Sequence, residues 1–184
     1  MEAFLVSTGL VALAEVGDKT QLLSLVLAAR FRQPWPIILG ILIATAANHA
    51  LAAGVGAWVT TLVAPGVLRW VVGLSFIAMA AWMVLPDELR LKTERERFGV
   101  LGTTIIAFFI VEMGDKTQVA TVALAAKYAT YFAVLAGTTA GMMIANIPAV
   151  LLGDKLAGRL PVRLVHGIAA LIFAALGLAV LFSA

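Results

Sequence analysis

The chain has 184 residues, of which 62% are hydrophobic and only 12% are charged, and its mean hydropathy is +1.05. A soluble domain usually carries about 25% charged residues, so this composition excludes an ordinary soluble domain and predicts a polytopic membrane protein. With no cysteine the chain has no disulfide, thiolate metal site or cysteine nucleophile, and its net charge of +3 comes without the basic, aromatic-interleaved stripe that would indicate a nucleic-acid partner.

Six stretches are long and apolar enough to cross a bilayer, which takes about 20 residues of helix. Pro65-Gly66 separates the second from the third, and Pro86 ends the third. The sequence therefore predicts an all-α polytopic membrane protein with six transmembrane helices, at 3–29, 37–62, 68–85, 100–126, 130–152 and 162–183.

The two halves of the chain repeat a seven-residue motif. Residues 15–21 read EVGDKTQ and residues 112–118 read EMGDKTQ, and Asn48 and Asn146 recur at nearly the same offset. Three helices per half make the halves enter the membrane from opposite sides. The sequence thus predicts two inverted three-helix repeats that share a site near the midplane, a plan typical of transporters, with repeats at 1–85 and 100–184 and a cytoplasmic connector at 86–99.

Basic residues predict the orientation, because they are enriched in cytoplasmic loops. With the N-terminus outside, only Arg69 and Lys127 lie on the exterior side. Nine basic residues then lie on the cytoplasmic side: Arg30, Arg32, Arg90, Lys92, Arg95, Arg97, Lys155, Arg159 and Arg163. We expect a bacterial plasma-membrane protein with both termini outside the cytoplasm.

Each motif puts charged side chains at bilayer depth, where each costs roughly 2.5–3.5 kcal/mol. On a continuous helix, Glu, Asp and Gln of the motif share one face at i, i+3 and i+6. If the two faces meet, four carboxylates and two amide oxygens converge, an all-oxygen set that suits Mn²⁺, Ca²⁺ or Mg²⁺. The predicted metal ligands are Glu15, Asp18, Gln21, Glu112, Asp115 and Gln118.

The charge balance of the motifs predicts exchange. Lys19 and Lys116 follow the glutamates at i+4, a spacing that favours an ion pair on a helix. Four acids and two lysines leave a charge of −2, which one divalent cation neutralises. Protons are the replacement when no cation is bound, because crowded carboxylates at low dielectric cannot all stay charged. Gly17 and Gly114 permit either close helix approach or a local break.

Other residues are predicted to support this site. Thr20 and Thr117 are candidate metal ligands, but they point away from the glutamate face on a helical projection. We therefore favour bonding to their own helix backbone over ligation. Asn48 and Asn146 are expected either to contact the site or its ligands or to bond a neighbouring helix. For His49, packing or hydrogen bonding is favoured over a role as a proton relay. Gly137 and Gly141 are expected to allow close helix packing.

Three other readings compete with a cation/proton antiporter. A single buried Glu–Lys pair can be a tether between helices, although two copies in an inverted repeat favour a site. A passive divalent-cation channel would not need protons, and an exporter of organic solutes does not suit an all-acid site. A metal-dependent intramembrane enzyme would need a phosphate clamp, but no arginine falls in the predicted membrane interior. We therefore expect no enzyme and no permanent cofactor; the partners are divalent cations, protons and lipid.

These residues resemble those of the Gdt-type cation/proton exchangers, whose signature is a doubled E-x-G-D-K/R-T/S motif in a chain of three plus three helices. The resemblance covers essentially the whole chain. It implies cation binding by Glu15, Asp18, Glu112 and Asp115, with the motif completed by Lys19, Thr20, Lys116 and Thr117. It also implies efflux of Mn²⁺ or Ca²⁺ driven by protons, because bacterial members of that family include manganese exporters.

Overall fold

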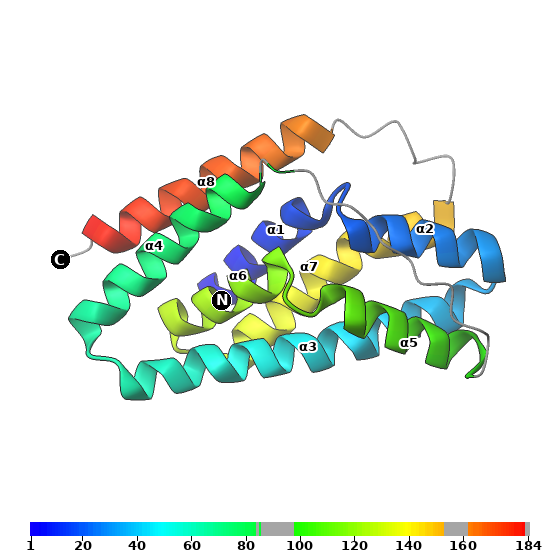
Figure 1. Cartoon of the computed structure of the whole chain (residues 1–184), viewed down its shortest axis with the longest axis horizontal. Helices are drawn as coiled ribbons and strands as arrows, with labels where there is room; N and C mark the ends of the chain where they lie inside the picture. Colours follow the sequence, from blue (N-terminus) through cyan, green and yellow to red (C-terminus); the bar gives the residue numbers. More distant parts are fainter. Residues whose placement is uncertain (84, 86–97, 153–161, 183–184) are drawn as a thin grey trace.

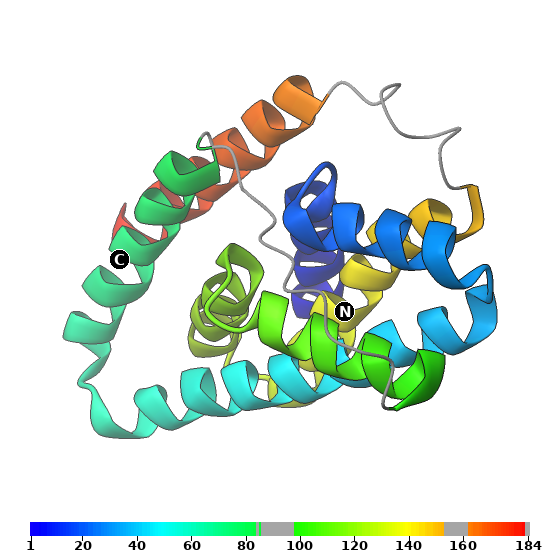
Figure 2. The same cartoon turned by 45° about the vertical axis from the view of Figure 1, so that its right-hand side comes forward.

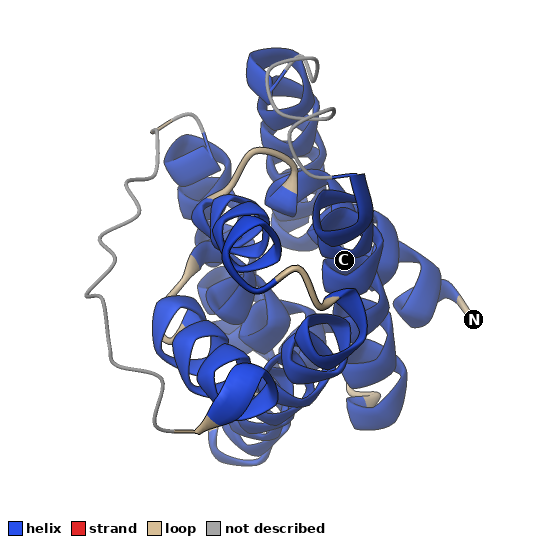
Figure 3. Ribbon diagram, turned by 90° about the vertical axis from the view of Figure 1, so that its right-hand side faces the viewer, coloured by secondary structure: helices blue, strands red, loops and turns tan. Residues whose placement is uncertain are grey.

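The computed structural model describes residues 1–83, 85, 98–152 and 162–182, and all regular structure in these ranges is α-helical (Figures 1 and 3). This confirms the predicted all-α class. In chain order the helices are α1 Glu2–Glu15, α2 Lys19–Phe31, α3 Pro34–Leu62, α4 Pro65–Met83, α5 Gly99–Glu112, α6 Lys116–Tyr128, α7 Tyr131–Leu152 and α8 Val162–Phe182.

The first and fourth predicted spans are each interrupted at the motif. Residues 3–29 form α1 and α2, and residues 100–126 form α5 and α6. The interruption occurs at glycine in both copies, because Gly17 has φ +79° and Gly114 has φ +77°. A side chain with a Cβ rarely adopts this left-handed conformation. The structure therefore shows the expected local break in both copies, and at Gly17 it also shows close approach, since an added Cβ would overlap the side chain of Val162 on α8.

Four helices, α3, α4, α7 and α8, are long and apolar enough to cross a membrane by themselves. The 13- and 14-residue helices at the motifs reach only about 20 Å, less than the roughly 30 Å hydrocarbon core. Each motif pair, α1 with α2 and α5 with α6, is long enough to cross the hydrocarbon core only if both of its helices contribute. These spans agree with a multi-pass membrane protein, and six crossings as inverted repeats stay a prediction.

The two halves interleave rather than pack as separate bundles. Helix α3 packs on α5 and α6 of the second half, whereas α7 packs on α1 and α2 of the first (Figure 1). Helices α4 and α8 lie side by side and form one flank of the molecule (Figure 2). The long helix that follows the motif in each half, α3 or α7, therefore packs on the motif helices of the other half.

Small residues make the α1–α7 contact possible. A Cβ added at Gly137 would lie 2.6 Å from the carbonyl oxygen of Phe4, and one added at Gly141 would lie 2.6 Å from that of Thr8. Both distances are too short for any side chain. The expected close-packing role of these two glycines is confirmed.

The two long connectors fall largely outside the described residues. The residues outside the described ranges include most of the predicted connector 86–99. They also include six of the nine predicted cytoplasmic basic residues: Arg90, Lys92, Arg95, Arg97, Lys155 and Arg159. Most of the basic residues that predict a cytoplasmic side therefore lie outside the described ranges. The orientation remains a prediction from sequence.

Replacing Gly141 with Ala should lower the melting temperature of the purified protein in detergent. The added methyl group would meet backbone atoms of α1, which cannot rotate away, and overpacking of this kind costs about 1–3 kcal/mol. Gly167→Ala is the matched control, since a Cβ at Gly167 has no heavy atom within 4 Å. Equal melting temperatures for the two variants would contradict the close α1–α7 contact.

Candidate metal centre

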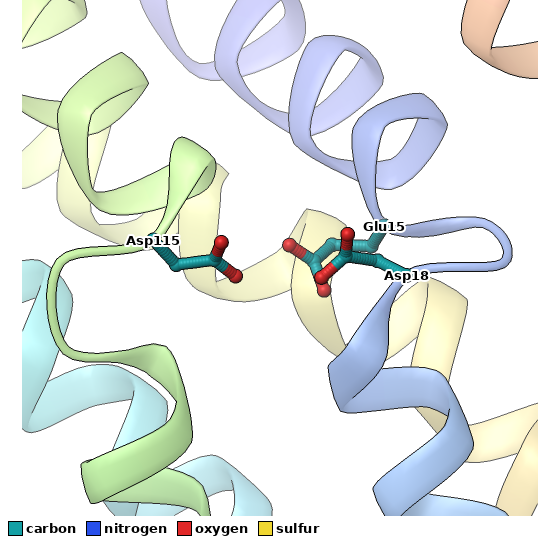
Figure 4. Close-up of side chains that lie close together, drawn as sticks. All are labelled: Glu15, Asp18 and Asp115. Carbon is teal, nitrogen blue, oxygen red and sulfur yellow. The ribbon is translucent and has the colours of Figure 1, made fainter. Parts of the chain in front are cut away.

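Three carboxylates from the two motifs meet in the interior. Glu15 ends α1, whereas Asp18 and Asp115 precede the first residues of α2 and α6. One oxygen from each carboxylate lies within 4.8 Å of the others (Figure 4). Their exposed fractions are 0%, 2% and 1%. Three anions so close together and so deeply buried need a cation or protons to compensate them.

The separation of the oxygens suits a bound cation. Ligands on opposite sides of Ca²⁺, with bonds of 2.3–2.6 Å, lie about 4.6–5.2 Å apart. The three oxygens need only small movements to reach one ion of this size. Because all three donors are carboxylate oxygens, the cluster favours hard divalent cations over soft ones.

The two motifs adopt the same backbone conformation. Asp18 has φ −77° and ψ 169°, and Asp115 has φ −78° and ψ 167°. In each copy the aspartate amide donates to the carbonyl of the glutamate, Asp18 to Glu15 and Asp115 to Glu112, at 3.1 Å. The breaks therefore place four helix ends around one region, and the positive N-terminal ends of α2 and α6 favour the aspartate charges.

The two glutamines brace the breaks. The Oε1 of Gln21 accepts a hydrogen bond from the Gly17 amide at 2.8 Å, and that of Gln118 accepts one from the Gly114 amide at 2.7 Å. Gln21 also donates through Nε2 to the carbonyl of Ala145 on α7. Both amide oxygens predicted as ligands thus already accept a backbone hydrogen bond that supports the loop, and their ligation of a metal stays a prediction.

The lysines do not form the expected i+4 pairs with the glutamates. The Nζ of Lys19 lies 3.0 Å from Oδ1 of Asp115 in the other motif, and the Nζ of Lys116 donates to the carbonyl of Leu85 at 3.0 Å. The prediction was wrong because it assumed a continuous helix. The break between Glu15 and Lys19 removes the geometry on which an i+4 pair depends.

Thr20 has a different role from the one predicted. Its hydroxyl donates to the Oε2 of Glu15, across the break, instead of to its own helix backbone. As a first-turn residue of α2, Thr20 has no helical carbonyl one turn before it. Thr117 is also buried and lies close to Glu15. The motif threonines therefore belong to the surroundings of the carboxylates.

Glu112 lies apart from the three-carboxylate cluster. Its Oε1 is 2.8 Å from Nε2 of His49, and its Oε2 accepts a hydrogen bond from Thr45 at 3.2 Å. All three side chains are completely buried. The four predicted carboxylates are thus divided into a group of three and a single Glu112 held by α3.

His49 makes the two motifs chemically different, because Ile147 occupies the corresponding position in the second half. The expected hydrogen-bonding or packing role did not specify the motif glutamate as its neighbour. Thr45 was missed altogether. The available signal was the i, i+4 spacing of Thr45 and His49, which places both on one face of α3.

The two repeated asparagines hold motif helices of the opposite half. Asn48 donates to the carbonyl of Phe109 in the last turn of α5 at 3.1 Å. Asn146 accepts a hydrogen bond from Ser24 of α2 at 2.7 Å and donates to the carbonyl of Met142 at 3.0 Å. Neither belongs to the three-carboxylate cluster, so both act as supports.

Two pairs of motif helices contact each other on opposite sides of the three-carboxylate cluster. Helices α1 and α6 contact each other on one side of it, and α2 and α5 contact each other on the other side (Figure 1). This agrees with the negligible exposure of the three carboxylates. Among the described residues, helices therefore contact each other on both sides of the cluster, which we call the closed arrangement.

His49→Leu should lower the melting temperature, because it leaves the buried Glu112 without its imidazole neighbour. Leaving a buried polar group without its partner costs about 1–3 kcal/mol. Glu112→Gln in the same background should recover part of that loss, since an amide carries no charge, and a double-mutant cycle from thermal unfolding measures the coupling. Ile147→Leu is the control at the corresponding position. Strictly additive effects of the two changes would contradict the pairing.

Comparison with known proteins shows the family of this chain. The family model described as "Divalent cation/proton antiporter GDT1" matches residues 3–90 and 100–184, which include both motifs. A Vibrio cholerae protein named "Putative manganese exporter" is 46% identical over 183 residues, covering 99% of this chain and 92% of that protein. The Synechocystis "GDT1-like protein sll0615" is 28% identical, with 94% and 93% covered, and the Oryza sativa "GDT1-like protein 3" is 29% identical, with 94% and 71% covered. No solved structure matches the chain. The chain belongs to the GDT1 family of divalent cation/proton antiporters.

Proposed function

We propose that this protein exports Mn²⁺ from the bacterial cytoplasm in exchange for protons, and that Ca²⁺ is the second cation it carries. The observation that carries the proposal is the buried cluster of Glu15, Asp18 and Asp115, whose oxygens lie within 4.8 Å of one another. The family supports cation/proton exchange, and the name of the Vibrio cholerae relative supports manganese.

The local charge supports exchange of one divalent cation for protons. The three carboxylates carry a charge of −3 when all are ionised, and Lys19 offsets part of it. One Mn²⁺ adds two positive charges to the cluster, and two protons add the same. Because the empty, fully charged cluster is costly in a buried site, the protein crosses between its two open states with either the metal or the protons bound.

The closed arrangement supports transport by alternating access. Separation of α2 from α5 would open the cluster toward one side, and separation of α1 from α6 would open it toward the other. We propose that the three-helix repeats rock against each other to do this, with six membrane crossings and both termini outside. Glu112, held by His49 and Thr45, joins the metal ligands when the repeats move.

Proteoliposomes with an acidic interior test the function. On addition of external Mn²⁺, we expect metal entry coupled to a rise of internal pH, and loss of both signals in Glu15→Gln and Asp115→Asn. Those changes remove one ligand charge while keeping the side-chain shape. Glu2→Gln is the control, since Glu2 lies at the other end of α1. Mn²⁺ flux that ignores the proton gradient would indicate a channel, and no flux of Mn²⁺ or Ca²⁺ would reject the proposal.

Single cysteines test the proposed orientation, because the natural chain contains none. Ala64→Cys, between α3 and α4, should react with a membrane-impermeant maleimide in intact cells or spheroplasts. Gln33→Cys, between α2 and α3, should react only after the membrane is opened. Both positions are exposed in the structure. The opposite labelling pattern would reverse the predicted orientation.

A further inference from the structure

The three-carboxylate cluster already contains a cationic side chain. The Nζ of Lys19, at the start of α2, lies 3.0 Å from Oδ1 of Asp115, which precedes α6. The same Oδ1 accepts a hydrogen bond from the Lys116 amide at 2.8 Å. The Lys19 ammonium therefore reaches from one motif to a carboxylate of the other.

An ammonium and a divalent cation compete at this position. A metal bound to Asp115 would sit about 2.0–2.6 Å from a carboxylate oxygen, in the region that the Lys19 ammonium occupies. Two positive charges a few ångströms apart repel each other strongly when water is largely excluded. Either the ammonium moves away or the metal binds weakly.

Lys19 is the less buried partner of this ion pair. Its side chain is 19% exposed, whereas that of Asp115 is 1% exposed. The four-carbon stem of lysine is flexible, so the ammonium can leave the carboxylate while the helix stays in place. The partly exposed member of this ion pair is thus Lys19, and the buried member is Asp115.

We propose that Lys19 is a tethered counter-cation, which neutralises part of the cluster while no metal is bound and which the incoming metal displaces from Asp115. The inference rests on the proposed function, because it takes the cluster as the metal site. Competition with Lys19 weakens metal binding and helps the metal to leave after the repeats have moved. Lys19 is therefore a positioning and affinity-setting residue.

The opposite role is that of a structural tether. A tether between the motifs would hold Asp115 in place, so its removal would weaken metal binding. A counter-cation opposes the metal, so its removal strengthens binding. The two roles differ in the sign of the change in affinity.

The test measures Mn²⁺ affinity of purified full-length protein in detergent at pH 8, from the electron paramagnetic resonance signal of free Mn²⁺. We expect Lys19→Met to lower the dissociation constant about tenfold, an ordinary size for coupled binding. Lys19→Arg should stay near the natural value. Lys127→Met is the control, since it removes the same charge at the far end of α6.

Chemical modification keeps the test independent of folding differences between variants. In Lys19→Cys, 2-aminoethyl methanethiosulfonate restores an ammonium at position 19, and methyl methanethiosulfonate adds a neutral group. Because the chain has no other cysteine, both reagents act at this position alone. The amino reagent should raise the dissociation constant about tenfold relative to the neutral one.

Failure of the inference is distinguishable from failure of the proposed function. Binding that is unchanged or weaker in Lys19→Met, and equal after both reagents, would overturn the counter-cation role while leaving the metal site intact. Natural protein that binds no Mn²⁺, or binding unaffected by Asp115→Asn, would overturn the proposed site itself and the inference with it.

Discussion

The burial of three carboxylates within 4.8 Å of one another is the constraint on which the rest of the structure depends. Such a group is unstable in a low-dielectric interior unless a cation or protons compensate it. The helix breaks place the N-terminal ends of α2 and α6 at the aspartates, and Lys19 adds an ammonium. Local backbone geometry and the Lys19 charge thus offset part of the cost of burying these acids.

Interleaving of the two halves explains how the breaks are maintained. A chain that leaves its helix at Gly17 or Gly114 loses regular backbone hydrogen bonds, and these must be replaced inside a membrane. Gln21 and Gln118 replace one bond in each copy. Helices α7 and α3 then hold the motif helices of the opposite half, through Asn146 and Asn48. Each half is thereby needed to complete the site of the other.

The two motifs have the same backbone and different surroundings. Glu15 belongs to the cluster and receives the Thr20 hydroxyl, whereas Glu112 is held by His49 and Thr45 on α3. The two motifs, which differ only at Val16 and Met113, do not encode this difference, because it comes from the helix that faces each motif. In an exchanger, a difference between the halves allows metal and protons to favour different carboxylates at different stages of transport.

The sequence by itself determined the all-helical class, the membrane character and the identity of the acidic residues, because hydropathy and a doubled charged motif are local signals. It also indicated close packing at Gly137 and Gly141. Only the tertiary structure decided that the motif helices break, that Glu112 stands apart, and that Lys19 pairs with Asp115 and not with Glu15. A helical projection assumes continuity, and a positive φ at Gly17 changes every neighbour relationship after it. Contacts between residues about a hundred positions apart depend on packing, which the motif alone does not specify.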